Sequence, residues 1–152
     1  MTVGAGKDLT WSRWVEIDTT LNGPTSMGTG GVAKLRYRRA GTLAHVLARA
    51  QFGTGAGGIS SITWNFDLPS GWVAQNTWTF YIGQALFIDN STPPSLDGRC
   101  YVGAGGSTIV LQALHVAAAP GYVGWAAVND TSPFTWAIND IVSCSIFFEL
   151  TA

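Results

Sequence analysis

Two glycine-rich stretches are the first places where this sequence could hold a cofactor. Residues 53–58, GTGAGG, place Gly53, Gly55 and Gly58 at the spacing of the G-x-G-x-x-G loop that binds dinucleotide phosphates. That loop works between a strand and a helix, because the helix N-terminus meets the phosphate. Here the strand-like ISSITWNFDL follows, and GAGGST at 103–108 lacks the lysine of a phosphate-binding loop. Both stretches are interpreted as loops, and no cofactor is expected.

The side chains that could catalyse a reaction or bind a metal show no pattern typical of either role. His45 and His115 stand alone, without a cysteine or second histidine at metal-ligand spacing. No G-x-S-x-G elbow marks a serine nucleophile. Most of the aspartates stand in turn contexts, which explain them without catalysis; they are Asp67, Asp89, Asp97, Asp130 and Asp140. A glycosidase needs only two acids that the fold brings together, but we expect neither a metal site nor enzyme activity.

The basic stretch KLRYRR is the strongest local charge signal. As a strand, it would place Lys34, Arg36 and Arg38 on one face and Leu35 and Tyr37 on the other. The face is either simply solvated or a contact for acidic groups, with which arginine forms bidentate pairs that fix orientation. A nucleic-acid role is not expected, because three charges on a chain of net charge −1 give little counterion-release affinity.

The composition shows an unusual shortage of charge. Charged residues make up 11% of the 152 residues, against about 25% in a typical soluble domain. No run of about 18 apolar residues could span a membrane, and the N-terminus lacks the apolar core of a secretion signal. We therefore expect a protein made in the cytoplasm whose surface is largely covered by partners. Cys100 and Cys144 are expected to stay reduced there.

The elements that must position these residues have the pattern of β-strands. Gly, Pro, Asn and Asp interrupt the sequence every ten to fifteen residues or so, which predicts an all-β fold. Near the C-terminus Val142, Cys144, Ile146, Phe148 and Leu150 alternate with polar residues, as in a strand with one buried face. Other alternating runs cover residues 62–68, 77–82 and 107–116, and the last of these is mostly apolar on both faces, as in a central strand.

Two segments leave alternatives open. GTLAHVLARAQF, residues 41–52, has helix formers and a helical apolar spacing, but its strand-rich surroundings favour a strand. Phe147 lies on the same face as Ser145 and Glu149, opposite the apolar row. Its cover is either a neighbouring copy around a three-fold axis or a loop of its own chain.

The order of several motifs resembles the C-terminal β-domain of tail and fibre proteins from tailed phages of actinobacteria. Those domains share G-x-x-x-x-R-Y-x-R-x-G, a glycine-rich loop, a strand that closes in L-P, and P-F-x-W-x-x-x-D before the last strand. The resemblance covers about residues 28–150. The matching positions are Arg36, Tyr37, Arg39, Gly41, Leu68, Pro69, Pro133, Phe134, Trp136 and Asp140.

The resemblance implies a homotrimeric, jelly-roll-like antiparallel β-sandwich exposed on a virion, with residues 41–52 as a strand. Residues 28–152 would form this domain. Fibre proteins carry a long region before the domain, whereas only residues 1–27 precede it here. We therefore expect a capsid decoration protein that binds the major capsid protein on the outside of the head. Phe147, Ser145 and Tyr37 are the expected trimer contacts, and Trp11, Trp14 and Arg13 the expected capsid anchor.

The alternative is a receptor-binding head of a tail fibre. Exposed aromatic side chains beside Gly- and Pro-rich turns stack on sugars, and Trp72, Trp125 and Tyr122 occupy such positions. In this alternative the partner is a saccharide of the host envelope. Core packing of these three aromatic side chains is the competing interpretation.

Overall fold

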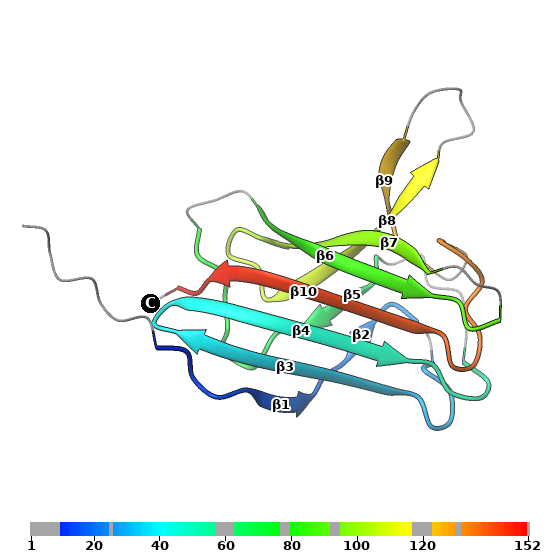
Figure 1. Ribbon diagram of the computed structural model, residues 1–152, viewed down its shortest axis with the longest axis horizontal. Coiled ribbons are helices and arrows are strands. Elements are labelled where there is room, and N and C mark those ends of the chain that lie inside the picture. The colour runs from blue at the N-terminus through cyan, green and yellow to red at the C-terminus, as the bar shows by residue number, and fades with distance from the viewer. Residues whose placement is uncertain are drawn as a thin grey trace, which may run out of the picture.

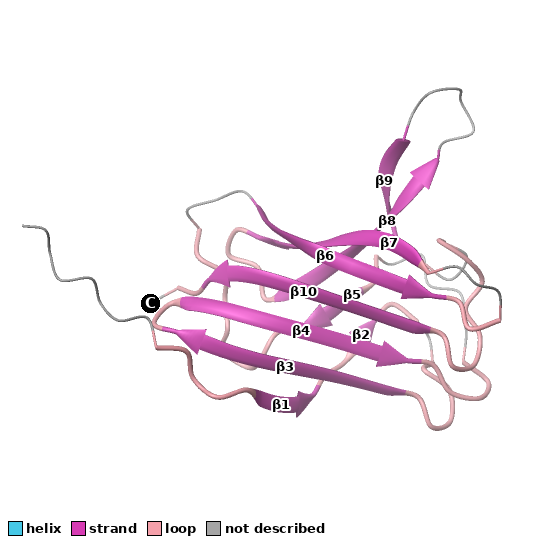
Figure 2. Cartoon of the chain, in the orientation of Figure 1, coloured by secondary structure: helices cyan, strands magenta, loops and turns pink. Residues whose placement is uncertain are grey.

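The computed structural model describes residues 10–151 except residue 25 and the stretches 57–62, 77–79, 92–94, 117–122 and 130–131. In this part of the chain the regular elements are all strands (Figures 1 and 2). They are β1 (Val15–Asp18), β2 (Leu21–Asn22), β3 (Val32–Ala40), β4 (Leu43–Gln51), β5 (Asn65–Asp67), β6 (Phe80–Ile88), β7 (Leu96–Gly103), β8 (Thr108–Val116), β9 (Val123–Ala127) and β10 (Ile141–Glu149).

The strands form one antiparallel sheet that curls into a half-barrel. Its order is β1-β3-β4-β10-β6-β7-β8-β5-β2, and β9 pairs with β8 outside this path. In Figure 1, β3, β4, β10 and β6 form the front of the molecule, with β5 and β2 behind them. The expectation of an all-β, antiparallel fold is therefore confirmed in the form of a continuous curled sheet.

The two edge strands of this sheet, β1 and β2, follow one another in the sequence. β1 pairs with β3 at one edge and β2 pairs with β5 at the other. Thr19 and Thr20 connect them: the amide of Thr19 donates to the carbonyl of Ala33 at 3.2 Å, and the amide of Asp67 donates to the carbonyl of Thr20 at 3.3 Å. The described residues of the segment assigned to anchoring therefore include two strands of the sheet.

Residues 43–51 form a central strand, as the resemblance implied. β4 pairs with β3 on one side and β10 on the other, along its whole length in both cases. The inward positions of β4 are Ala44, Val46, Ala48 and Ala50, all buried. The helical spacing in this segment does not determine its structure, because pairing on both sides satisfies every backbone group in the extended form.

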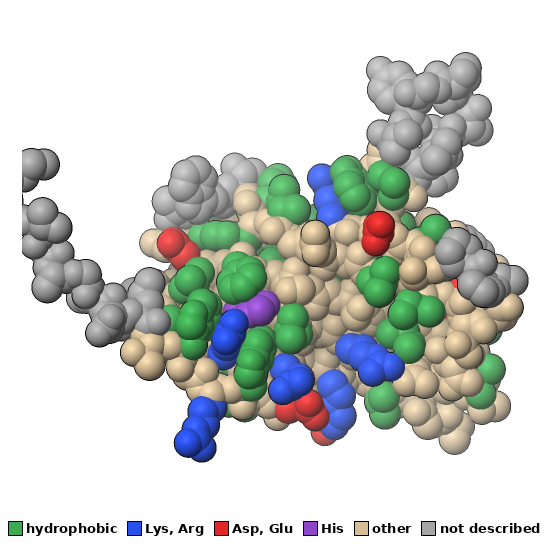
Figure 3. All heavy atoms as spheres, viewed as in Figure 1, with side chains coloured by type: hydrophobic (Ala, Val, Ile, Leu, Met, Phe, Trp, Pro, Cys, Tyr) green, Lys and Arg blue, Asp and Glu red, His purple; other side chains and the backbone are tan. Residues whose placement is uncertain are grey.

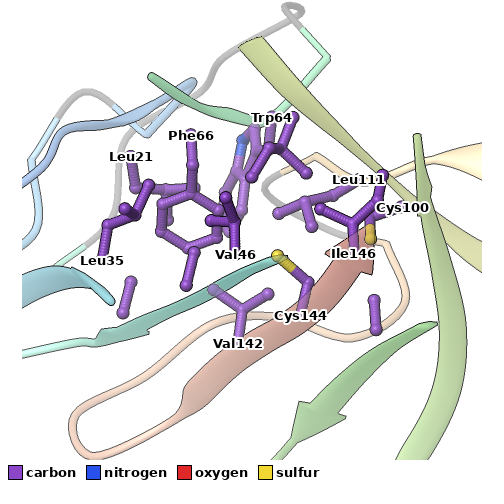
Figure 4. Packing of buried hydrophobic residues seen from close by; sticks show 14 of the residues in the cluster. Leu21, Leu35, Val46, Trp64, Phe66, Cys100, Leu111, Val142, Cys144 and Ile146 are labelled. Carbon is purple, nitrogen blue, oxygen red and sulfur yellow. The ribbon is translucent and has the colours of Figure 1, made fainter. Parts of the chain in front are cut away.

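The hydrophobic core lies inside the curve of the sheet, between its two halves. The expected alternation of β10 is confirmed, since Val142, Cys144, Ile146 and Phe148 are buried. Figure 4 shows side chains from β10 pointing into the same space as Trp64 and Phe66. Trp64 packs on Trp136 at 4.8 Å between ring centroids, and both contact the ring of Phe52.

Asp140 is fully buried and organises the loop that leads into β10. Its carboxylate accepts hydrogen bonds from the amides of Asn90 at 2.9 Å and Ala137 at 2.6 Å. Its carbonyl accepts a bond from the amide of Phe52 at 3.0 Å. The expected turn role is thus confirmed for Asp140, but it is wrong for Asp67 and Asp97, which lie within β5 and β7.

Cys100 and Cys144 are buried free thiols, as expected. The hydrogen bond to Cys100, together with burial, raises the pKa of the Cys144 thiol well above its ordinary value. The Cys100 thiol donates to the carbonyl oxygens of Gln84 and Ser145. Both cysteines therefore act as small apolar residues of the core.

β6 carries apolar residues on both of its faces, the outer one as well as the inner one. Its inward positions are Tyr81, Gly83, Ala85 and Phe87, so Phe80 and Ile82 point outward. Gly83 is required because an added Cβ would overlap the backbone of Ser145 on the adjacent strand. The result is an apolar row on the outer surface, 56% exposed at Phe80 and 64% at Ile82.

Two glycines of β7 provide a matched test of this close packing. An added Cβ at Gly98 would overlap the ring of Phe87 and lie 2.6 Å from the carbonyl oxygen of Gln112, whereas one at Gly103 would meet nothing within 4 Å. We expect Gly98→Ala to lower the free energy of unfolding by about 1–3 kcal/mol and Gly103→Ala to change it by less than about 0.5 kcal/mol. Urea denaturation of both variants checks this, and equal stability would contradict the packing described.

Candidate interaction face

The outer face of β3, β4, β10 and β6 gathers most of the residues that the sequence analysis selected. Arg38, His45 and Phe147 form one row across β3, β4 and β10, because the register pairs His45 with both of the others. Figure 3 shows the histidine of this face in purple, with hydrophobic side chains in green and basic ones in blue around it. Lys34, Arg36 and Arg38 share this face, as predicted.

The N-terminal segment lies over this row and partly covers Phe147. The ring of Phe147 stacks on His45 at 3.8 Å and 18°, and Trp11 meets it edge-on at 6.2 Å. Trp14 packs edge-on against His45 at 5.1 Å. We call Trp11, Trp14, Arg38, His45 and Phe147 the aromatic cluster. The cover comes from the chain itself, yet Phe147 remains 49% exposed.

Arg38 holds the two tryptophans together. Its guanidinium lies 4.7 Å from the ring centroid of Trp11 and 4.8 Å from that of Trp14. Such cation–π contacts are each worth about 0.5–2 kcal/mol, depending on desolvation. Between the tryptophans, Ser12 fixes the segment to the end of β3: its amide donates to the carbonyl of Arg39 at 2.8 Å, and its hydroxyl accepts from the amide of Arg39 at 3.0 Å.

The other two basic residues of the predicted contact face have acidic partners in β1. Lys34 forms an ion pair with Asp18, and Arg36 lies 3.7 Å from the carboxylate of Glu16. The hydrogen bond and charge of Asp18 raise the pKa of Lys34. Both pairs are exposed to solvent and so contribute little stability, but they neutralise two of the three predicted charges.

His45 and Ser145 form a pair that superficially resembles a base and its nucleophile. Nε2 of His45 lies 3.2 Å from Oγ of Ser145, and Nδ1 lies 3.4 Å from the Arg38 guanidinium. Arginine can only donate, so Nδ1 must accept and Nε2 carries the hydrogen. The imidazole then donates to the serine, which is the reverse of what a general base does. Burial, together with the charge of Arg38, also lowers the pKa of His45.

Beside Phe147, the outer face becomes apolar. The pairing of β10 with β6 ends at Ser145 and Gln84, and Phe147 and Ile82 follow two residues beyond that pair on the same outer face. Phe80 follows on β6 and contacts Tyr101 of β7 edge-on at 5.3 Å. We call Phe147, Ile82 and Phe80 the apolar end; each is at least 49% exposed. Apolar side chains that adjoin one another on a surface indicate an interaction site more strongly than scattered ones.

A depression of about 930 Å³ occupies the middle of the same face. Ser143 and Ser145 line it from β10, with Leu47 and Arg49 on the β4 side and Gln84, Leu86 and Asp97 on the side of β6 and β7. The serines are small relative to their neighbours on both sides, which explains the hollow. The residues of the apolar end do not line it.

The remaining predicted site residues lie elsewhere. Tyr37 points to the inner side of β3, where it packs edge-on against Trp72 at 4.7 Å, so it does not share a surface with Phe147. Trp72 is itself half-buried against the core and lines a small pocket of about 240 Å³. Trp125 is 42% exposed, with the Arg99 guanidinium 4.7 Å from its ring. Tyr122 lies outside the described residues.

No group of three or more side chains able to hold a metal ion occurs within the described ranges. In the same part of the chain, no helix has the length and apolar character that a membrane crossing needs.

Sequence reasoning did not predict that the side chains of Phe80 and Ile82 point to the outer surface. The alternation in residues 77–82 predicts a strand but does not say which of its two rows faces the core. Gly83, which packs closely against Ser145, belongs to the row that faces inward.

The cation–π contacts of the aromatic cluster can be measured with a double-mutant cycle. Trp11→Ala and Arg38→Met should each destabilise the fold, and their effects should couple by about 0.5–2 kcal/mol because the two side chains touch. The free energy of unfolding of both single variants, the double variant and the parent chain gives the coupling. Trp11→Ala combined with Arg99→Met is the control, for which we expect none. Additive effects in the first pair would contradict the contact.

The lowered pKa of His45 predicts a specific dependence of stability on pH. The unfolded chain binds a proton at this histidine near pH 6.5 and the folded chain only at lower pH, so its contribution is present above pH 6.5 and lost as the pH falls. His45→Gln removes this titration and leaves every carboxylate in place. The stability advantage of the parent chain over the variant should therefore shrink between pH 7.5 and pH 5 in urea denaturation. A constant difference would contradict it.

No family model, no curated protein and no solved structure matches the chain. A function for this face must therefore be argued from its own residues.

Proposed function

We propose that this chain is a structural protein of a tailed-phage virion, which decorates the outside of the head as a jelly-roll-like homotrimer. Each trimer would sit at a local three-fold position, bind the major capsid protein and stabilise the assembled shell by mass action. The observation that carries the proposal is the apolar end, where Phe147, Ile82 and Phe80 adjoin one another and are largely exposed. The order of motifs described above adds the phage context.

Association of copies through the apolar end accounts for its exposure. Burying a phenylalanine or isoleucine side chain completely is worth roughly 1.5–3 kcal/mol, and cyclic symmetry repeats the gain in every copy. Since each of these three side chains is already partly covered, the gain per residue is a fraction of that value. Ser145, beside Phe147 on β10, would lie near the edge of this contact, whereas Tyr37 is left out because it faces inward.

The distribution of charge suggests which side of the molecule meets the capsid shell. We call the side formed by Arg13, β1, β3 and β4 the basic flank. Residues 13–49 hold six basic and two acidic side chains, while the other described residues hold one basic and five acidic ones. In the first group Arg13 and Arg39 are exposed and form no ion pair within the described part of the chain. This flank would therefore receive acidic groups of the capsid protein, since arginine pairs well with carboxylates.

The N-terminal segment belongs to this flank. In the proposal, Trp11 and Trp14 hold the segment on the sheet by packing around Arg38, which presents the exposed Arg13 between them. The anchoring role expected of these three residues would thus be divided. The tryptophans fix the segment, and the arginine makes the contact with the capsid.

A second candidate function is a receptor-binding head that recognises a saccharide of the host envelope. It is favoured by Trp125, whose indole is 42% exposed and lies beside Arg99. Arg99 also donates to the side-chain oxygen of Gln112 at 2.6 Å, so an aromatic ring and polar groups lie close together on β7, β8 and β9. Such a combination can stack on and hydrogen-bond to a sugar.

The number of copies per virion separates the two candidates. The decoration function predicts hundreds of copies per particle, in fixed proportion to the major capsid protein. A receptor-binding head predicts a handful, confined to the tail. Quantitative mass spectrometry of purified virions measures this number. A count of a few dozen copies or fewer would overturn the decoration function.

Charge substitutions test the contact between copies. Ile82→Asp and Phe147→Asp should shift the purified protein from trimer to monomer in sedimentation equilibrium, because each places a carboxylate in the apolar contact. Ile82 is the cleaner test, since its side chain is 64% exposed and leaves the aromatic cluster intact. Leu114→Asp is the control, at an equally apolar position that is 48% exposed on β8. Equal trimer content in all three variants would contradict the proposed interface.

A further inference from the structure

Some of the polar side chains that line the depression in the middle of the outer face have no hydrogen-bond partner among the described residues. Ser143, Gln84 and Asp97 make no side-chain hydrogen bond within the described part of the chain. Arg49 makes one long bond, 3.5 Å, to the side chain of Gln51. Neighbouring polar groups that the fold itself does not use are a feature of ligand sites.

These groups are arranged in two adjacent rows across the sheet. One row runs from Leu47 through Ser145 to Gln84. The next runs from Arg49 through Ser143 and Leu86 to Asp97. Arg49 and Asp97 stand three strands apart, roughly 14 Å at the usual strand spacing. The depression therefore offers an elongated site with a donor at one end and an acceptor at the other.

The charges of the site cancel. Five charged side chains line the depression, but Arg36 is paired with Glu16, and Lys34 with Asp18 just outside the lining. Arg49 and Asp97 remain, and they are opposite in sign. An anionic ligand would be opposed by Asp97 and a cationic one by Arg49. A purely apolar ligand would bury the unpaired groups of Ser143 and Gln84, which is costly. The site therefore fits a neutral ligand rich in hydroxyl groups.

We propose that this depression binds a neutral oligosaccharide. Each sugar hydroxyl can both donate and accept, so it satisfies the hydroxyls of Ser143 and Ser145, the amide of Gln84 and the two charged ends. Leu47 and Leu86 provide apolar contact for the C–H groups of the sugar rings. The volume of about 930 Å³ lies within the range of small-molecule sites, about 300–1,000 Å³.

The proposal does not rest on the decoration function. The residues of the apolar end do not line the depression, and Ser145 lies where the two surfaces meet. The depression also differs from the surface around Trp125, because neither Trp125 nor Arg99 lines it. Oligomeric state and sugar binding can be measured on the same sample, so failure of one proposal is distinguishable from failure of the other.

The test is isothermal titration calorimetry of the full chain against six defined probes. Five are neutral: maltohexaose, cellohexaose, chitohexaose, an α-1,6-mannohexaose and an α-1,5-arabinohexaose. The sixth is an anionic hyaluronan hexasaccharide. We expect at least one neutral probe to bind with a dissociation constant below about 1 mM, the weak end of specific recognition, and more tightly than the anionic probe. No neutral binding at 10 mM probe, or preference for the anionic one, would overturn the proposal.

Three variants locate the binding. Ser143→Trp fills the depression and should weaken binding of the neutral probe at least tenfold, and Asp97→Asn should weaken it severalfold by replacing the charged acceptor. Leu114→Trp places the same indole on β8, outside the depression, and should leave binding unchanged. Thermal unfolding confirms that each variant is folded. Undiminished binding by a folded Ser143→Trp, or equal loss in Leu114→Trp, would place the sugar elsewhere and overturn the assignment.

Discussion

The pairing of β4 with β10 is the constraint on which the rest of the structure depends. The two strands pair over nine residues in the middle of the sheet, and each is paired again on its other side. Because side chains alternate across a strand, this register fixes both surfaces at once. Val46 and Ile146 are directed inward to the core, and His45 and Phe147 are brought face to face outside. A shift of one residue would exchange the core and the outer face.

The N-terminal segment depends on that same register. Its two tryptophans find a site only because Arg38, His45 and Phe147 are aligned on adjacent strands. Further along, its strands β1 and β2 form the two edges of the curled sheet, where they pair with β3 and β5. The segment therefore contributes to the fold in two ways: it covers part of an aromatic surface, and it pairs with β3 and β5, which would otherwise be edge strands open to pairing with other chains.

The sequence predicted the parts of the structure that depend on local alternation. The buried face of β10, the outward row of Lys34, Arg36 and Arg38, and the turn role of Asp140 follow from neighbouring residues and were confirmed. The strand at 43–51 needed its pairing partners, since its own spacing also suits a helix. The outward direction of Phe80 and Ile82 was not predictable from alternation alone, because both rows of β6 contain apolar residues. Nor was the packing of Trp11 and Trp14 around Arg38, which joins positions 24–27 residues apart.

We propose that the apolar end is a contact between copies of this chain. A cysteine at position 82 combined with a short bis-maleimide cross-linker tests it most directly, because the native Cys100 and Cys144 are buried and protected from the reagent. If three copies meet there, cross-linked Ile82→Cys protein gives covalent dimers with a short linker and trimers with a three-armed one, but nothing larger. Monomer alone at protein concentrations of tens of micromolar, or an open ladder of larger products, would contradict the account.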